Sequence, residues 1–296
     1  MNLLWLEQPA AQQIALVGGK AANLSRLAAG YRVPSGFCLT TAAFERAHRA
    51  GPNATLPSSL YAELAAAYRR LAALTDSAEP QVAVRSSAID EDGDTASFAG
   101  QHETYLNVAG VDAIAAAVQR CWMSALAPRA LTYRRERGLA TDRVRLAVLI
   151  QQLVAADVAA VVFSANPLTG ARDEVVINAS WGLGESIVGG TVTPDTYVAR
   201  KDGGALLSRT LAEKRRMTVA VPSGTREVDV PRLLQAQPTL SDAQVAEMAE
   251  LAGSLEQRTG WPVDIECAYA GGALYLLQCR PITTLPRVDL HARAAA

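Results

Sequence analysis

The feature that most constrains the fold is a segment near the C-terminus, residues 261–283, whose pattern predicts a β-hairpin with two unlike faces. Alternate residues of a strand point to the same face of a sheet. One face therefore carries four polar residues: Asp264, Glu266, Gln278 and Arg280. The other face carries Ile265, Cys267, Tyr269, Tyr275, Leu277 and Cys279. These sets coincide only if the connection has an odd number of residues, which predicts a three-residue Ala-Gly-Gly loop at 270–272 with a glycine at positive φ.

The polar face of this hairpin combines the groups that a site for a metal ion and a polyphosphate requires. Mg²⁺ in proteins is bound by one or two carboxylates together with phosphate oxygens of a substrate. Arginine binds phosphate through its planar fork of N–H donors. Two carboxylates, an amide and a guanidinium on one surface therefore predict a magnesium and phosphate site.

The length of the chain favours two lobes, because 296 residues exceed a typical single domain. Helical periodicity dominates up to residues 144–154 and β-type patterns follow, so we expect an α+β architecture with a seam in that segment. We expect an N-terminal lobe over residues 1–145, a C-terminal lobe over 146–284 and a tail over 285–296.

Local patterns predict most of the individual elements. Residues 3–6 are a short apolar start, and strands are expected at residues 36–40, 81–85, 103–108, 144–154, 158–164, 175–179, 195–199 and 205–210. Helices are expected at residues 21–29, 42–50, 59–73, 111–125, 128–137 and 241–259. Residues 86–100 and 180–194 are expected to be polar loops, and residues 218–237 to be irregular. Polar loops of this length in a compact domain are usually functional or disordered.

Composition excludes several classes of function. The net charge of −1 provides no electrostatic attraction for nucleic acid or for a membrane surface. No apolar run approaches the roughly 18 residues of a membrane span, and the N-terminus lacks the pattern of a signal peptide, so we expect a cytoplasmic protein. The four cysteines show no CxxC spacing and are expected to be packed free thiols. The three histidines are too scattered for a zinc site.

Candidate phosphate contacts precede the hairpin. A Gly-Gly-Lys turn at residues 18–20 enters a helix, where backbone N–H groups and Lys20 can hold an anion; the alternative is a helix-initiating turn with a solvated lysine. Arg85 ends a strand and opens a polar loop, a suitable place for binding a charged ligand; the alternative is an ion pair with an aspartate or glutamate at 90–92. Residues 97–101 can fold their backbone over phosphates, with Thr104 behind them, or form a disordered surface loop.

Other polar residues leave more than one interpretation open. Gln151 and Gln152 interrupt an apolar run at the seam, where a nucleotide base is usually bound, and must find a partner or a ligand. Lys214 and the Gly-Leu-Gly-Glu stretch at 182–185 contact phosphate or the other lobe; alternatively, residues 214–216 are a solvated charge run. No histidine (His48, His102 or His291) has the surroundings of a nucleophile.

Eight segments together resemble one family, the ATP-binding domain of phosphoenolpyruvate synthase, pyruvate phosphate dikinase and rifampicin phosphotransferase. They are Val-Gly-Gly-Lys-Ala-Ala-Asn-Leu (17–24), Val-Pro-Ser-Gly-Phe (33–37), Val-Ala-Val-Arg-Ser-Ser-Ala (82–88), Ala-Ser-Phe-Ala-Gly-Gln (96–101), Gly-Leu-Gly-Glu (182–185), Val-Thr-Pro-Asp-Thr-Tyr (192–197), Asp-Ile-Glu-Cys-Ala (264–268) and Leu-Gln-Cys-Arg-Pro-Ile-Thr (277–283). Their order and approximate spacing agree from about residue 12 to residue 284.

This resemblance implies a two-lobed, ATP-grasp-like fold with an ATP site between the lobes. Lys20 and Arg85 would hold the phosphates, Gly100 and its loop would cover them, and Thr104 would support them. Gln151 would lie near the adenine. The hairpin would supply the remaining contacts: Glu266 and Gln278 would bind Mg²⁺, Arg280 would hold the phosphate tail, and Asp264 would be a metal ligand or a supporting group. Lys20, Arg85 and Arg280 would be the catalytic residues, acting through positioning and charge neutralisation.

The resemblance also implies an incomplete reaction. In this family the β,γ part of ATP goes to a histidine on a mobile swivelling domain and AMP is released. No segment here matches that domain or the acceptor domain, so we expect a separate polypeptide or a missing domain to carry the phosphohistidine. Two alternatives remain open: a stand-alone ATP-grasp kinase or ligase that phosphorylates a small molecule, and a module that senses ATP without catalysis. The chain is also consistent with a piece of a longer enzyme.

Overall fold

The contacts within the chain divide it into two units. In the computed structural model, the described residues are 1–49, 56–90, 103–136, 138–141, 144–222, 224–283 and 285. One unit comprises Met1–Val154 and Ala220–Arg226, and the other comprises Ala155–Val219 and Glu227–Ala296. The main boundary therefore follows Val154, nine residues later than the expected boundary after residue 145.

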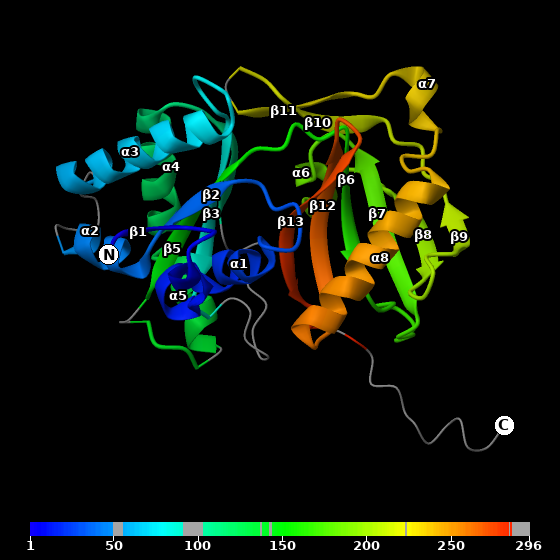
Figure 1. Cartoon of the computed structure of the whole chain (residues 1–296), viewed down its shortest axis with the longest axis horizontal. Coiled ribbons are helices and arrows are strands. Elements are labelled where there is room, and N and C mark those ends of the chain that lie inside the picture. The colour runs from blue at the N-terminus through cyan, green and yellow to red at the C-terminus, as the bar shows by residue number, and fades with distance from the viewer. Residues whose placement is uncertain are drawn as a thin grey trace. The chain divides into compact units, whose positions relative to one another are not determined.

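The first unit contains a five-stranded sheet in the order β1-β2-β5-β3-β4 (Figure 1). Its strands are β1 (Leu3–Trp5), β2 (Gly36–Leu39), β3 (Val82–Ala88), β4 (Thr104–Val108) and β5 (Leu146–Gln152). All four strand pairs are antiparallel. Because β5 pairs with both β2 and β3, it joins the first unit and moves the boundary past the position expected from sequence.

Helices cover both faces of this sheet. They are α1 (Ile14–Leu27), α2 (Thr41–His48), α3 (Ser58–Leu74), α4 (Val111–Ser124) and α5 (Pro128–Glu136), with a short 3-10 helix at Pro9–Gln12. The even-numbered residues of β3 and β5, such as Val84 and Ile150, pack in one core with Leu64 of α3 and Ile114 of α4. Each fully buried aliphatic side chain there stabilises the unit by about 1.5–3 kcal/mol. The opposite face, with the odd-numbered residues, receives α1.

The second unit contains a six-stranded antiparallel sheet in the order β13-β12-β6-β7-β8-β9. Its strands are β6 (Val158–Phe163), β7 (Glu174–Trp181), β8 (Asp195–Arg200), β9 (Leu206–Thr210), β12 (Val263–Ala270) and β13 (Ala273–Pro281). Helix α8 (Asp242–Thr259) begins with a capping box between Ser241 and Gln244, as the Ser-x-x-Gln pattern favours. It lies across the sheet in Figure 1 and covers the face that carries Ile177, Tyr197 and Ile265, which are all buried. On β6 the even-numbered residues, such as Val162, share this face.

The hairpin confirms the predicted polar face but corrects the predicted loop. Ala270 pairs with Ala273, so the turn contains only Gly271 and Gly272, both at positive φ. The extra residue that parity requires lies within β13 instead. Glu266 pairs with Gln278 and Cys267 pairs with Leu276, so Leu277 has no pairing partner on β12. This β-bulge restores the parity that the polar face requires. Between the bulge and the turn, the residues of β13 therefore lie on the opposite face from the one expected. Leu276 is buried, whereas Tyr275 and Leu277, which were expected on the apolar face, are half-buried.

Three expected loop segments contain regular structure. Strand β3 continues to Ala88, and β7 continues to Trp181 before the four-residue helix α6 (Glu185–Val188). Residues expected to be irregular form strands β10 (Arg216–Ala220) and β11 (Thr225–Asp229), which pair with each other, and the short helix α7 (Arg232–Gln235). Short, partly exposed strands of this kind leave weak periodic signals. Residues 91–100 lie outside the described residues.

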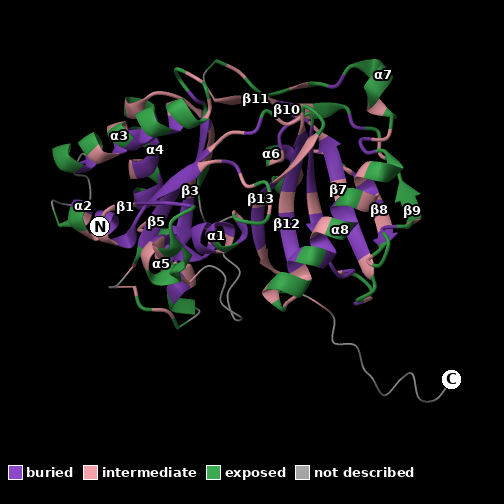
Figure 2. Ribbon diagram, in the orientation of Figure 1, coloured by how far each residue is buried: buried purple, intermediate pink, exposed green. Residues whose placement is uncertain are grey.

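Burial follows the two sheets. Figure 2 shows mostly buried strands in each sheet, while the helices carry exposed residues on their outer sides. All four cysteines are buried free thiols, as expected from sequence. Among the described residues, no helix combines the length and apolar character that crossing a membrane requires.

Candidate functional site

Helix α1 is kinked at Gly18, which explains the Gly-Gly-Lys sequence. Gly18 has φ of 73°, and a Cβ built there would lie 2.1 Å from the carbonyl oxygen of Ser87. Only glycine permits this approach to β3. The helix resumes after the kink, where the backbone N–H of Ala21 donates to Oγ of Ser87 at 3.2 Å. The predicted turn is therefore a kink within a helix that begins four residues earlier.

The close approach of α1 to β3 also positions Lys20. Its Nζ donates to the backbone carbonyl of Ser86 at 3.4 Å, and its side chain is half-buried. Lys20 is thus held beside β3 instead of extending freely into solvent, which argues against the alternative of a solvated lysine. Arg85 lies in the same segment of β3 and is also half-buried.

Register places three predicted site residues on one face of the first sheet. Arg85 pairs with Thr104 on β4 and with Leu149 on β5. Gln151 lies two residues beyond Leu149 and therefore shares this face, the face that receives α1. Asp90, one of the alternative partners of Arg85, forms an ion pair with Arg134 at 2.8 Å. The first unit thus brings Lys20, Arg85, Thr104 and Gln151 to one side of its sheet.

Gln151 has found a partner within the protein. The residue is only 2% exposed, and its Nε2 donates to the carbonyl of Pro34 at 3.2 Å. This bond ties β5 to the segment before β2. The location of the adenine beside Gln151 stays a prediction. Gly100, the covering loop at 97–100 and His102 lie outside the described residues.

In the second unit, an ion pair orients Arg280. Its Nε and Nη2 each lie 2.8 Å from Oδ2 of Asp264, which is directly opposite on β12. Burial raises the pKa of Asp264, the nearby Arg280 opposes this shift, and the Glu266 carboxylate adds to it. Asp264 contacts the Arg280 guanidinium on one side only. The side chain of Arg280 remains 38% exposed and is accessible to an anion.

Glu266 and Gln278 form the adjacent pair on the same face. They are opposite each other in the register, and Gln278 is only 5% exposed. In the part of the chain that the structure describes, no hydrogen bond is made by the Gln278 amide. Its polar atoms are not among the fully buried polar atoms that lack a partner, so the amide is open to a ligand.

This pair fits a magnesium ion that is shared with a phosphate. Within the described residues, no group of three or more His, Cys, Asp or Glu is arranged as a closed metal site. Mg²⁺ characteristically takes only one or two protein carboxylates and fills its octahedron with water and substrate phosphate oxygens. A Glu266 carboxylate beside a Gln278 amide oxygen meets that requirement.

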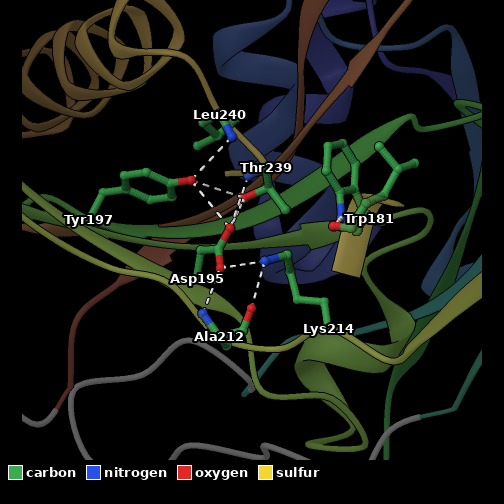
Figure 3. Close-up of polar contacts among 8 residues, drawn as sticks. Trp181, Asp195, Tyr197, Ala212, Lys214, Thr239 and Leu240 are labelled. Carbon is green, nitrogen blue, oxygen red and sulfur yellow. Dashed lines mark hydrogen bonds and ion pairs between the residues drawn. The ribbon is translucent and has the colours of Figure 1, made fainter. Parts of the chain in front are cut away.

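Lys214 is not part of a solvated charge run, and its nearest anion is a carboxylate of the same unit. Both Lys214 and Asp195 are buried, and Nζ lies 2.6 Å from Oδ1 (Figure 3). Asp195 also accepts hydrogen bonds from Ala212, Tyr197 and Thr239. Arg215 and Arg216 are exposed, as a charge run predicts. The pair therefore secures the segment that leads into β10.

The Gly-Leu-Gly-Glu stretch packs against that segment. Gly182 has φ of 77°, and a Cβ there would lie 2.4 Å from the carbonyl oxygen of Thr218. The same carbonyl accepts the N–H of Leu183 at 2.8 Å. These contacts define the shape of the glycine stretch. Its contact with phosphate stays a prediction.

Sequence reasoning missed Asn178 on the polar face of the second sheet. Asn178 of β7 pairs with Val161, which pairs with Glu266, so all three share that face. The available signal was a single amide interrupting the apolar run at 175–179.

Comparisons with known proteins identify the family of the chain. Residues 52–295 match the family model described as the pyruvate phosphate dikinase AMP/ATP-binding domain. The rifampicin phosphotransferase of Streptomyces sviceus is 40% identical, over 96% of this chain and 36% of its own length. The probable phosphoenolpyruvate synthase of Methanocaldococcus jannaschii is 35% identical over 99% of this chain and 27% of its own length, and the phosphoenolpyruvate synthase of Pyrococcus furiosus is 34% identical over 95% and 44%.

The chain thus spans less than half the length of each of these relatives. The family match covers most of the chain and includes the polar hairpin, Lys214 with Asp195, and Arg85. The α+β composition of the two units agrees with that match. The chain belongs to the pyruvate phosphate dikinase AMP/ATP-binding domain family.

Proposed function

We propose that this chain is the ATP- and Mg²⁺-binding part of a dikinase-type phosphotransferase. It activates ATP for transfer of the β,γ-pyrophosphoryl group to a histidine on a separate swivelling domain. A bond forms between the histidine nitrogen and Pβ, the bond between Pβ and the α,β-bridging oxygen breaks, and AMP leaves. Two relatives named phosphoenolpyruvate synthase and rifampicin phosphotransferase, both much longer than this chain, support a role that another domain completes.

The observation that carries the proposal is the polar face of β12 and β13. Gln278 makes no side-chain hydrogen bond to the described residues, while the Arg280 guanidinium beside it is held by Asp264 and remains accessible. This arrangement is preorganised for an anion that brings its own metal ion. Preorganised charges need no reorganisation when the reaction occurs, which is why such groups stabilise a transition state more than water does.

Each predicted residue then has a role. Arg280 binds the phosphate tail through its N–H donors, and Lys20 and Arg85 add positive charge from the first unit. Mg²⁺ held by Glu266 and Gln278 would neutralise the charge that develops on the phosphate oxygens. Thr104 and the loop containing Gly100 support and cover the phosphates, and Gln151 lies near the adenine. Catalysis consists of positioning and charge neutralisation, as is general for phosphoryl transfer.

The test is to identify the nucleotide product. The chain is incubated with Mg²⁺ and with ATP labelled at the β- or the γ-phosphate, with and without a polypeptide that carries the swivelling histidine domain of a relative. We expect AMP, and label from both positions on the added polypeptide, only in the complete mixture. The matched control is the same polypeptide with its acceptor histidine replaced by alanine.

Other outcomes distinguish the alternatives. ADP formed with a small molecule alone would identify a direct kinase and overturn the pyrophosphoryl step. Tight ATP binding without turnover in every mixture would identify a sensing module. Absence of nucleotide binding in all conditions would overturn the assignment of the ATP site itself.

A further inference from the structure

A row of five residues crosses the second sheet on the face opposite α8. The pairing is Gln278 with Glu266, Glu266 with Val161, Val161 with Asn178, and Asn178 with Thr196. Residues paired in register lie side by side on one face. Tyr269, which has the opposite parity, contacts Glu247 of α8, and this shows that the row faces away from that helix. The row therefore extends from the proposed metal site into the middle of the sheet.

Asn178 has an amide oriented by its neighbour. Oγ1 of Thr196 donates to Oδ1 of Asn178 at 2.9 Å, so the oxygen end of the amide is occupied. Across the described ranges, the Nδ2 end makes no hydrogen bond to the protein. Asparagine is unfavourable in the middle of a strand, and a half-buried polar group there needs a partner. The hydroxyl of Thr196 thus fixes Asn178 as a donor.

The chemistry of a neutral donor selects its ligand. Phosphate oxygens only accept hydrogen bonds, so they match an amide whose acceptor is already used. Ribose hydroxyls are commonly bound by a carboxylate, which accepts their protons. An aspartate at this position would repel phosphate, whereas an asparagine adds no charge to a row that already contains the Glu266 carboxylate.

The spacing suits the end of a polyphosphate. Glu266 and Asn178 are two strands apart, roughly 9–10 Å between backbones, since neighbouring strands are ~4.8 Å apart. A metal ion held by Glu266 would place the phosphates that it binds close to this carboxylate, on the side of the row that leads to Asn178. Val161 lies beneath this space and contributes only an apolar surface.

We propose that Asn178 is a specificity-determining residue that donates a hydrogen bond from Nδ2 to the terminal phosphate of ATP. The inference rests on the proposed function, because it assumes a nucleotide whose metal ion is held by Glu266 and Gln278. Its consequence is that Asn178 distinguishes a triphosphate from shorter nucleotides, with Thr196 as the positioning residue that keeps the amide in the correct orientation.

Calorimetric binding tests this with three ligands: the β,γ-imido analogue of ATP, ADP and AMP, each with Mg²⁺. We expect Asn178→Ala to weaken binding of the ATP analogue by about tenfold, the range for a hydrogen bond to a charged group, and to change binding of ADP and AMP by less than about twofold. Asn178→Asp should weaken the ATP analogue further by repulsion. Thr196→Val should produce a smaller loss with the same selectivity, and Thr196→Ser should bind as wild type.

The matched control is Asn166→Ala, because Asn166 lies in the same unit and donates to Glu174. Equal losses for all three nucleotides, or no loss for the ATP analogue, would overturn the role of Asn178 while leaving the proposed function intact. A larger loss for AMP than for the ATP analogue would place Asn178 at the nucleoside instead and equally overturn the inference. A wild-type protein that binds none of the ligands would overturn both proposals. Thermal unfolding of each variant confirms that the fold is retained.

Discussion

Asp264 on β12 and Arg280 on β13 are opposite each other, and both Nε and Nη2 of the arginine contact one carboxylate oxygen at 2.8 Å. The carboxylate is nearly buried, at 8% exposed, whereas the guanidinium is partly accessible. Asp264 therefore fixes the orientation of the Arg280 guanidinium. A carboxylate expected as a metal ligand or a supporting group thus has a defined contact in the structure, to the guanidinium.

Replacement of Asp264 by asparagine should change how stability depends on pH. Burial raises the pKa of Asp264 above its ordinary value of 3.8, although Arg280 opposes the shift. The folded state then binds the proton more tightly than the unfolded state, so this group stabilises the fold at low pH and loses that contribution as pH rises through the folded pKa. Asp264→Asn should remove this loss.

Urea unfolding of wild type and Asp264→Asn, from pH 4 to pH 7, measures the difference. The free energy of unfolding of the variant, relative to wild type, should increase with pH. A difference that is flat or that decreases with pH would show that Arg280 outweighs burial and that the pKa of Asp264 is not raised.

Glu266→Ala and Arg280→Ala should each abolish ATP-dependent chemistry without unfolding the protein. Each removes a group worth several kcal/mol of charge stabilisation, so nucleotide turnover with the acceptor polypeptide should fall by at least about 100-fold. The controls are Glu250→Ala and Arg215→Ala, which change exposed residues of the same unit. Unchanged turnover in either site variant, with its circular dichroism spectrum preserved, would refute the site assignment.

Lys214→Met should destabilise the second unit. The substitution leaves Asp195 as a buried carboxylate without its cation, a change that typically costs about 3–5 kcal/mol. Arg215→Met, next in sequence, removes an exposed charge paired with Glu213 and should leave the denaturation midpoint unchanged. Equal midpoints for the two variants would contradict the structural role of the Lys214–Asp195 pair.

Gly18→Ala should be more destabilising than the same substitution at a glycine that also has positive φ but has free space around it. Gly18 and Gly190 both have positive φ, but nothing lies within 4 Å of a Cβ built at Gly190. Gly190→Ala should cost about 1 kcal/mol from backbone strain alone. Gly18→Ala adds a collision with Ser87 and should cost a further ~1–3 kcal/mol, measured by thermal unfolding. ATP should also bind more weakly, because the collision displaces Lys20 from β3.

The three histidines should not carry the phosphoryl group. His48 stacks on Phe44 with ring centroids 5.2 Å apart, and His102 and His291 lie outside the described residues. Alanine at each position should preserve turnover and labelling of the added acceptor polypeptide. Label retained on this chain by wild type, and lost in any one of these variants, would identify an internal carrier and refute the need for a separate domain.

Strong periodicity and capping signals made many elements predictable. The helix at 241–259 and its Ser241 cap, the strand at 36–40 and the helix at 111–125 are confirmed within a few residues, because their apolar spacing and caps are local properties. Strands β10 and β11 were missed, because short hairpins with exposed faces are stabilised by pairing that a local pattern does not contain.

The hairpin and Lys214 show the limits of local reasoning. The alternation of polar and apolar residues correctly required one extra residue between the two paired strands. A three-residue loop and a β-bulge both supply it, and only the observed pairing of β12 with β13 shows that the extra residue is Leu277. From the sequence, Lys214 either contacts phosphate or the other lobe, or belongs to a solvated charge run with its neighbours. Its burial depends on Asp195, 19 residues earlier, and the attraction between two distant charges is not visible in either segment alone.

By itself, the sequence determined that the chain has an α+β fold, that Asp264, Glu266, Gln278 and Arg280 share one strand face, and which family the motifs resemble, since these follow from residue order and alternation. Only the tertiary structure decided that Asp264 orients Arg280, that Lys214 is a buried structural partner, and that Asn178 lies in the row of Glu266. Those facts depend on which strands are neighbours, because register and burial arise when segments far apart in the chain exclude water together.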